Sequence, residues 1–409
     1  MHTLFGYLKY YSFDSIDVRP ISPEDSVVLT AVSYLMFENV MGYSDVRSFQ
    51  ELRDFTDQMS VGALLPPLVL ETYELMLKTE RFKDLIVENV YFIADIKAQC
   101  RISACTYRFN KNTIVVSFRG TDLSLLAWKE DFNLGYNTTI PGHIESLNYL
   151  TDVIKKNPGA NVYVCGHSKG ANLATFSSCR IDPELAKQIV TVYDLDGPGF
   201  SKDFFDTPDY LRMESKFTRL IPHDDIVGQL LTHNPDFKVV KTLKLMKVAQ
   251  HAQFIWLFKD GRLKYAKRVS NFTNRFSYLI KKLLKQTPDS DIAVLTQKGF
   301  KVFEDAGIVY LHDFFIPSRK RQKRIIQNYE SLSPEDRDII MHLIRMVAKA
   351  YLIAEFDILF ITKKTVSFKR KPNKYIKIVA QEEKKKIEKQ RLKDEKRLHK
   401  QEEKIKSLV

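Results

Sequence analysis

The expected fold rests on one stretch, Val162-Tyr163-Val164-Cys165-Gly166-His167-Ser168-Lys169-Gly170-Ala171-Asn172-Leu173-Ala174. An apolar, strand-like run leads into G-x-S-x-G, and a helix-forming run follows it. In this context the motif predicts a nucleophile elbow, a turn so tight that the serine is strained and its hydroxyl stands clear of the sheet. Gly166 and Gly170 leave room there, and the amide of Lys169 points to where an oxyanion forms. The alternative is an ordinary strand-to-helix turn capped by the serine.

Strand-like and helix-like segments alternate around this stretch. The expected strands cover 86–93, 102–109, 113–118, 161–165, 189–195 and 216–221, and the expected helices cover 24–41, 67–82, 144–155 and 169–179. This alternation predicts an α/β fold with a mostly parallel central sheet that helices cover on both faces. From about residue 263 the pattern becomes helical. We therefore expect a hydrolase-like domain over 1–262, a helical region over 263–362 and a charged tail over 363–409.

The composition limits the classes of protein to which the chain can belong. The chain has 409 residues, of which 44% are hydrophobic and 28% charged, as in a globular protein. Residues 363–409 contain 18 Lys and Arg against 7 Asp and Glu, so the tail carries most of the net charge of +13. That distribution argues against a nucleic-acid binder as a whole. The tail is either a solvated or disordered segment or a docking segment for an anionic membrane surface or RNA.

Cysteine usage and the N-terminus suggest a compartment. The four cysteines (Cys100, Cys105, Cys165 and Cys179) are too few for a disulfide scaffold and fit a reducing cytoplasm. The N-terminus has no signal-peptide pattern, and no apolar run is long enough to span a bilayer. We expect a cytoplasmic protein, with peripheral membrane association as a further option.

A second strand, 113–118, ends in Arg119-Gly120-Thr121-Asp122. An acyl-transfer enzyme needs a second donor to the oxyanion from a neighbouring strand. Thr121 offers its amide and its hydroxyl for this purpose. The alternative is an ordinary turn with no catalytic role.

An acid and a histidine complete the expected site. Hydrolases of this fold follow the chain order serine, acid, histidine, and Asp224 and Asp225 follow the strand 216–221. Asp196, at the end of the strand 189–195, is a third candidate acid. His251 follows a strand-like run over 237–245, which favours it as the base, and His233 is the alternative.

The sequence resembles the class 3 lipases among the α/β-hydrolases, and more closely a bacterial, lipase-like family of unknown function. The shared segments lie at 118–122, 128–132, 166–174, 197–200 and 224–228, and the N-terminal 25–35 region is also similar. The resemblance covers about residues 1–260, or at its widest up to residue 360, and leaves the tail outside. It implies that Ser168 is the nucleophile, Asp225 the acid and Thr121 an oxyanion donor. Lys169 replaces a residue that is usually small or apolar, and Gly228 stands where such lipases commonly have proline.

These observations lead to two hypotheses. The first is a serine hydrolase that cleaves a small-molecule or lipid ester or thioester: His251 deprotonates Ser168, Asp225 holds His251, and the amides of Thr121 and Lys169 stabilise the oxyanion. This chemistry requires no metal and no cofactor. The second is a hydrolase-fold scaffold with a vestigial site, recruited through its basic tail. The sequence does not indicate an oligomeric state.

Overall fold

The computed structural model describes residues 2–63, 65–243 and 247–355. Its main sheet has nine strands in the order β1-β2-β3-β4-β5-β6-β7-β8-β11. The central run from β4 to β8 is parallel, and the strands at both edges are antiparallel. The strands are β1 (Val46–Ser48), β2 (Ile86–Asp95), β3 (Cys100–Asn110), β4 (Thr113–Phe118), β5 (Asn161–His167), β6 (Ile189–Leu195), β7 (Phe217–Pro222), β8 (Lys238–Val240) and β11 (Tyr265–Ala266), with β9 (Phe258–Lys259) and β10 (Arg262–Leu263) forming a separate pair.

Helices cover both faces of the sheet because side chains alternate along each strand. Val115 of β4 packs into one apolar core, whereas Ile114 and Val116 pack into the other. The first core lies under α1 (Leu4–Tyr11), α2 (Pro23–Val32) and α4 (Pro66–Met76), and the second under α6 (Pro141–Lys156), α7 (Lys169–Arg180) and α9 (Pro208–Met213). This arrangement confirms the expected α/β-hydrolase fold.

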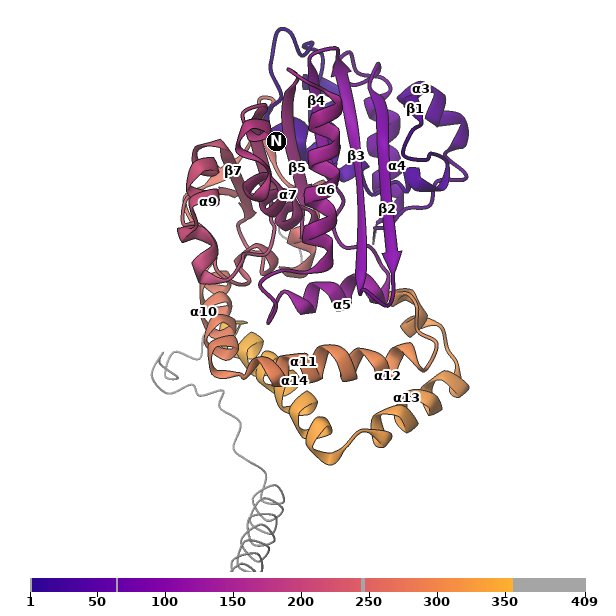
Figure 1. Ribbon diagram of the computed structural model, residues 1–409, viewed down its shortest axis with the longest axis vertical. Helices are drawn as coiled ribbons and strands as arrows, with labels where there is room; N and C mark the ends of the chain where they lie inside the picture. The colour runs from indigo at the N-terminus through magenta and orange to yellow at the C-terminus, as the bar shows by residue number, and fades with distance from the viewer. Residues whose placement is uncertain (1, 64, 244–246, 356–409) are drawn as a thin grey trace, which may run out of the picture.

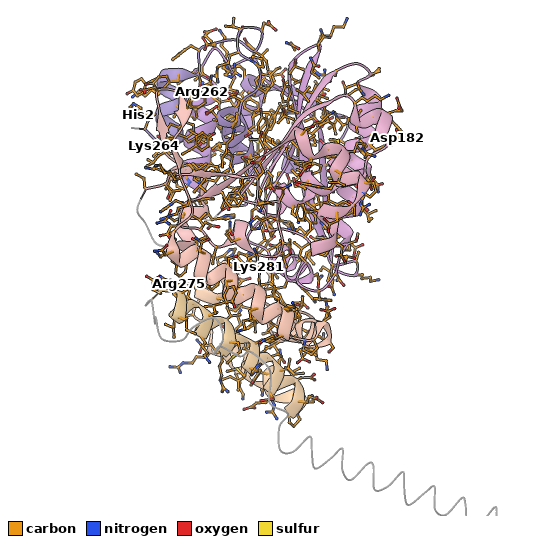
Figure 2. All side chains as sticks on the ribbon, turned by 90° about the vertical axis from the view of Figure 1, so that its left-hand side faces the viewer. His2, Asp182, Arg262, Lys264, Arg275 and Lys281 are labelled. Carbon is orange, nitrogen blue, oxygen red and sulfur yellow. The ribbon has the colours of Figure 1, made fainter. Side chains whose placement is uncertain are left out.

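A helical layer lies across the end of the sheet at which the parallel strands finish (Figure 1). It consists of α10 (Asn271–Gln286), α11 (Asp289–Val294), α12 (Phe300–Glu304), α13 (Arg319–Ser331) and α14 (Pro334–Glu355). Figure 2 shows Arg275 and Lys281 of α10 in this layer, below the body of the molecule. The layer contacts α5 (Leu125–Asn133), which follows β4, for example through the ion pair of Lys129 with Glu304 at 3.0 Å.

Several expected boundaries move in the structure. The helix expected over 24–41 ends at Val32, and the strand expected over 237–245 is only three residues long. The sheet continues past residue 262, because β11 pairs with β8. The tail over 363–409 lies outside the described residues. None of the helices in the described part of the chain has the length and apolar character needed to cross a membrane.

Candidate active site

Ser168 occupies the sharp turn between β5 and α7. Its φ is 59° and its ψ is −131°, a conformation that costs a non-glycine residue of order 1–3 kcal/mol. A Cβ at Gly166 would lie 2.1 Å from the carbonyl oxygen of Gly170, and one at Gly170 would lie 2.1 Å from that of Phe118. Both positions therefore require glycine, and the strained serine that the motif predicts is present.

The turn after β4 lies against this elbow. A Cβ at Gly120 would lie 2.6 Å from the carbonyl oxygen of His167 and 3.2 Å from the Cβ of Ser168. The hydroxyl of Thr121 donates to Asp131 Oδ2 at 2.5 Å, so the expected hydroxyl contribution to an oxyanion hole is already committed. The amide of Thr121 remains for that role. Lys169 is the first residue of α7, and the first amides of a helix have no acceptor inside it.

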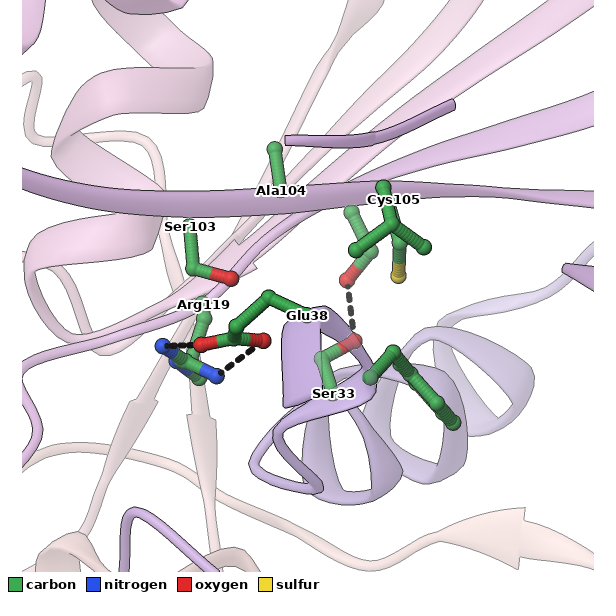
Figure 3. Close-up of a pocket in the computed structure, with 9 residues that line it drawn as sticks. Ser33, Glu38, Ser103, Ala104, Cys105 and Arg119 are labelled. Atoms are coloured by element: carbon green, nitrogen blue, oxygen red, sulfur yellow. Dashed lines mark hydrogen bonds and ion pairs between the residues drawn. The ribbon is translucent and has the colours of Figure 1, made fainter. Parts of the chain in front are cut away.

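Arg119 fixes the position of the turn after β4. Its guanidinium makes a two-pronged ion pair with Glu38, at 2.5 and 3.1 Å, underneath β3 (Figure 3). Both side chains are almost fully buried, at 3% and 9% exposure. A bidentate pair of this kind restricts both side chains to one geometry, which holds the following Gly120-Thr121 segment in place.

The side chain of Lys169 interacts with the two acidic residues of the segment over 128–132. It points away from the turn, and its Nζ donates to Glu130 Oε2 and to the carbonyl oxygen of Arg101, both at 2.9 Å. Asp131 lies 3.7 Å from the same ammonium. Lys169 and Glu130 are 2% and 0% exposed, so the ion pair is buried between α7 and α5. Lys169 stands where related lipases usually have a small residue, and two acidic residues on α5 provide the counter-charge for its ammonium group.

We expect Lys169→Met to lower the free energy of unfolding by about 3–5 kcal/mol, because it leaves the buried Glu130 carboxylate without a counter-charge. Urea unfolding measures this change. Lys301→Met is the control, since its ion pair with Asp305 is largely exposed and contributes less than about 1 kcal/mol. The double variant Lys169→Met/Glu130→Gln should recover part of the loss. Equal destabilisation in Lys169→Met and the control would contradict the assignment.

His251 lies beside the elbow, and its partner is Asp196. The ring centroid of His251 is 4.4 Å from that of His167, the residue before the serine. Its Nδ1 is 2.7 Å from Asp196 Oδ2, and the carboxylate is 0% exposed. The sequence favours Asp225 as the residue that holds His251; in the structure Asp196 makes this hydrogen bond. The reason is local: Asp196 follows β6 with a φ of 56°, a left-handed conformation that aspartate tolerates better than most residues.

Asp225 also lies near the ring, because one of its oxygens is within 4.8 Å of a nitrogen of His251 and of an oxygen of Asp196. Its Oδ2 accepts the amides of Val227 and Gly228, at 2.5 and 3.3 Å. The buried Oδ1 atoms of Asp196 and Asp225 have no other hydrogen-bond partner, and the two carboxyl groups are within hydrogen-bonding reach of each other. Burial raises the pKa of Asp196 to about 8, and that of Asp225 well above its usual value. Burial of the two neighbouring carboxyl groups thus favours the form of the pair that keeps a proton.

Arg219 fixes the two loops that carry these acids. Its guanidinium donates to Asp194 Oδ2 at 2.6 Å and to the carbonyl oxygens of Gly197 and Gly228, at 2.7 and 2.9 Å. A Cβ at Gly228 would lie 2.1 Å from Asp196 Oδ1. The glycine that replaces the usual proline is therefore required by the position of Asp196.

His167 orients the backbone of His251. Its Nε2 donates to the carbonyl oxygen of His251 at 2.9 Å, and its Nδ1 accepts the hydroxyl of Tyr34 at 3.0 Å. Burial holds the pKa of His167 well below its usual value, so the ring is neutral. Both ring nitrogens are thus used by the scaffold. The elbow pattern alone gives no sign of this role for its second residue.

The remaining candidates have other partners. Asp224 accepts hydrogen bonds from the ammonium group of Lys247, at 2.9 Å, and from the hydroxyl of Ser270. His233 packs against Phe237, with ring centroids 5.5 Å apart, and burial lowers its pKa to about 3. Asp224 is therefore engaged by an ion pair and a hydrogen bond, whereas His233 is held by packing and its buried Nδ1 has no hydrogen-bond partner among the described residues.

The same trio of Asp196, Asp225 and His251 could also hold a cation, because ligand atoms of all three lie within 4.8 Å of one another. Two of these possible ligand atoms, His251 Nδ1 and Asp225 Oδ2, already take part in the hydrogen bonds described above. What the arrangement provides chemically is a hydroxyl on a strained turn, an imidazole with a carboxylate on Nδ1, and two free backbone amides.

A family model described as Mbeg1-like matches residues 76–301, which is more than half of the chain. The chain belongs to the Mbeg1-like family. The match spans the elbow, the Arg-Gly-Thr turn, the α5 acids, Asp196, Asp225 and His251, whereas Tyr34 and Glu38 lie outside the Mbeg1-like region. This confirms the lipase-like family that the motifs indicate.

Solved structures of fungal lipases are similar to this Mbeg1-like chain, at low identity. Lipase II from Rhizopus niveus is 17% identical, over 56% of this chain and 91% of that one, with a TM-score of 0.30. A mutant of MDLA from Penicillium cyclopium is 13% identical, over 58% and 82%, with a TM-score of 0.35. The Rhizomucor miehei lipase in its propeptide complex is 16% identical, over 54% and 67%, with a TM-score of 0.31. No curated protein matches the sequence.

Proposed function

We propose that the chain is a serine hydrolase that cleaves an ester or thioester through an acyl-enzyme on Ser168. The observation that carries the proposal is the strained elbow at Ser168, because a positive φ at a non-glycine residue persists only where its surroundings enforce it. The neighbouring His251–Asp196 pair supplies a base of the required kind.

The proposed reaction uses only groups of this chain. His251 Nε2 takes the proton of Ser168 Oγ as that oxygen attacks the carbonyl carbon of the substrate. The amides of Thr121 and Lys169 donate to the oxyanion, at the positive end of α7. His251 then protonates the leaving alcohol or thiol, and a water molecule that His251 deprotonates releases the acid and restores the serine. Asp196 keeps the proton of the resting imidazole on Nδ1, so that Nε2 is free to act as the base.

The test is hydrolysis of a panel of fluorogenic esters and thioesters of increasing acyl length by the full chain, with Ser168→Ala prepared in parallel. Turnover that depends on Ser168 supports the proposal. A wild-type rate no higher than that of Ser168→Ala across the whole panel contradicts it and favours the scaffold.

The pH profile provides a second prediction. The base must be neutral, so kcat/KM falls as pH drops through the pKa of His251. Burial lowers that pKa below its usual value of about 6.5. We therefore expect the acid limb of kcat/KM for a fluorogenic ester to have its midpoint below about pH 6.5. A midpoint at or above that value would contradict a His251 that is held neutral by its surroundings.

A further inference from the structure

The segment between α12 and α13 exposes apolar side chains to solvent. Phe314, Phe315 and Ile316 are consecutive and exposed, and Phe315, at 85%, is the most exposed large hydrophobic side chain in the described part of the chain. Val309, earlier in the segment, is also exposed. A run of this kind is costly in water and marks a contact surface.

The backbone of this segment is held in place. The amide of Leu311 donates to the carbonyl oxygen of Leu123, and the amide of Leu125 donates to that of Val309, both at 2.8 Å. The ring of Phe314 packs edge-on against Phe303, with centroids 5.1 Å apart. The exposed side chains are therefore presented by a backbone that is tied to α5.

A cluster of cations follows directly. The first two turns of α13 carry Arg319, Lys320, Arg321, Lys323 and Arg324, and no acidic residue occurs between 314 and 329. Arg321 donates to the carbonyl oxygen of Asp313 at 2.7 Å, within the segment. The other four are exposed, and no carboxylate pairs with them among the described residues. α13 lies on the side of the helical layer that faces away from the sheet (Figure 1).

We propose that the apolar segment over 309–317 and the cations over 319–324 form one docking surface for an anionic lipid bilayer. Apolar and aromatic side chains enter the boundary between headgroups and acyl chains, and adjacent Lys and Arg side chains meet anionic headgroups. An anionic bilayer offers an apolar boundary for the segment over 309–317 and anionic headgroups for the cations over 319–324. An RNA partner would satisfy the cations but would leave Ile316 and Pro317 without a function. The surface lies on the helical layer at the end of the sheet that carries the candidate active site, and the proposal does not depend on catalysis.

Cosedimentation of the full chain with vesicles tests the proposal. The vesicles are pure phosphatidylcholine or phosphatidylcholine mixed with phosphatidylserine. Each Lys or Arg at an anionic surface contributes about a fivefold change in affinity, so we expect Arg319→Gln/Lys320→Gln/Lys323→Gln/Arg324→Gln to weaken binding to the mixed vesicles at least about 100-fold. The control is Lys111→Gln/Lys155→Gln/Lys156→Gln/Lys187→Gln. It removes the same charge at the opposite end of the parallel strands, and we expect it to bind like the wild type.

A second variant tests insertion of the apolar segment. Phe315→Trp should show a blue-shifted emission with mixed vesicles and quenching by brominated lipid, beyond the signal of Trp128 and Trp256 in the wild type. Phe315→Ser/Ile316→Ser should bind more weakly than the wild type in the same assay. Circular dichroism checks that each variant is folded, and all the altered side chains are exposed.

Several results would overturn the proposal. One is equal vesicle binding by the α13 variant and its control, which would assign any binding to other parts of the chain. Another is Phe315→Trp emission that vesicles and brominated lipid leave unchanged. A third is loss of polyuridylate binding in the α13 variant with vesicle binding intact, which would make the surface a nucleic-acid site. Absence of wild-type binding to the mixed vesicles would also overturn it.

Discussion

Replacing Ser168 with alanine is expected to abolish covalent labelling by an alkyl fluorophosphonate and to lower kcat for ester hydrolysis by about 10⁶-fold. The reason is that no other hydroxyl stands on the strained turn beside His251. Alanine occupies the positive φ of 59° at a cost similar to that of serine, so the fold should be retained. Gel fluorescence measures labelling, and a fluorogenic ester measures turnover.

Two controls sharpen the Ser168 prediction. Ser201→Ala, at an exposed serine, should be labelled like the wild type. Ser168→Gly should be equally inactive but more stable than Ser168→Ala by of order 1 kcal/mol, because glycine relieves the backbone strain. Labelling of Ser168→Ala at the wild-type level would place the nucleophile elsewhere.

Asparagine at position 196 should lower kcat/KM by about 10⁴-fold, whereas asparagine at position 225 should lower it by less than about tenfold. Asp196 Oδ2 accepts a hydrogen bond from His251 Nδ1, and an amide in its place can offer that nitrogen a donor and so favour the wrong tautomer. We expect Asp225 to act as a protonated acid, because burial raises its pKa well above the usual value; its Oδ2 accepts two amides, and its buried Oδ1 would carry the proton toward the neighbouring Asp196. An asparagine reproduces both roles, with its carbonyl as the acceptor and its NH₂ as the donor.

The comparison of these two variants decides which acid holds the histidine. Steady-state kinetics on one ester, with circular dichroism to confirm folding, provide the measurement. The reverse order of effects, a severe loss in Asp225→Asn and a mild one in Asp196→Asn, would restore the assignment that the resemblance to class 3 lipases implies. Asp224→Asn is the matched control, because Asp224 pairs with Lys247 and Ser270, and it should retain wild-type kcat/KM.

The sequence by itself determined the parallel sheet, the elbow and the turn after β4. These features depend on short-range patterns: apolar runs followed by Gly166-x-Ser168-x-Gly170 and by Arg119-Gly120-Thr121. A side chain at either elbow glycine would collide with backbone from the same turn or from the next strand. The glycines are recognised because they stand in a short pattern of consecutive residues, which can be read without knowing the rest of the fold.

Only the tertiary structure decided which acid contacts His251 and which one binds backbone amides. Asp225 lies in the expected position along the chain, yet Asp196 reaches His251 because its backbone is left-handed and because Gly228 leaves room for its carboxylate. Lys169 likewise finds Glu130 across the interface between α7 and α5. Which of several buried carboxyl groups keeps its charge depends on desolvation and on partners brought together from distant strands, and no local pattern in the sequence records that balance.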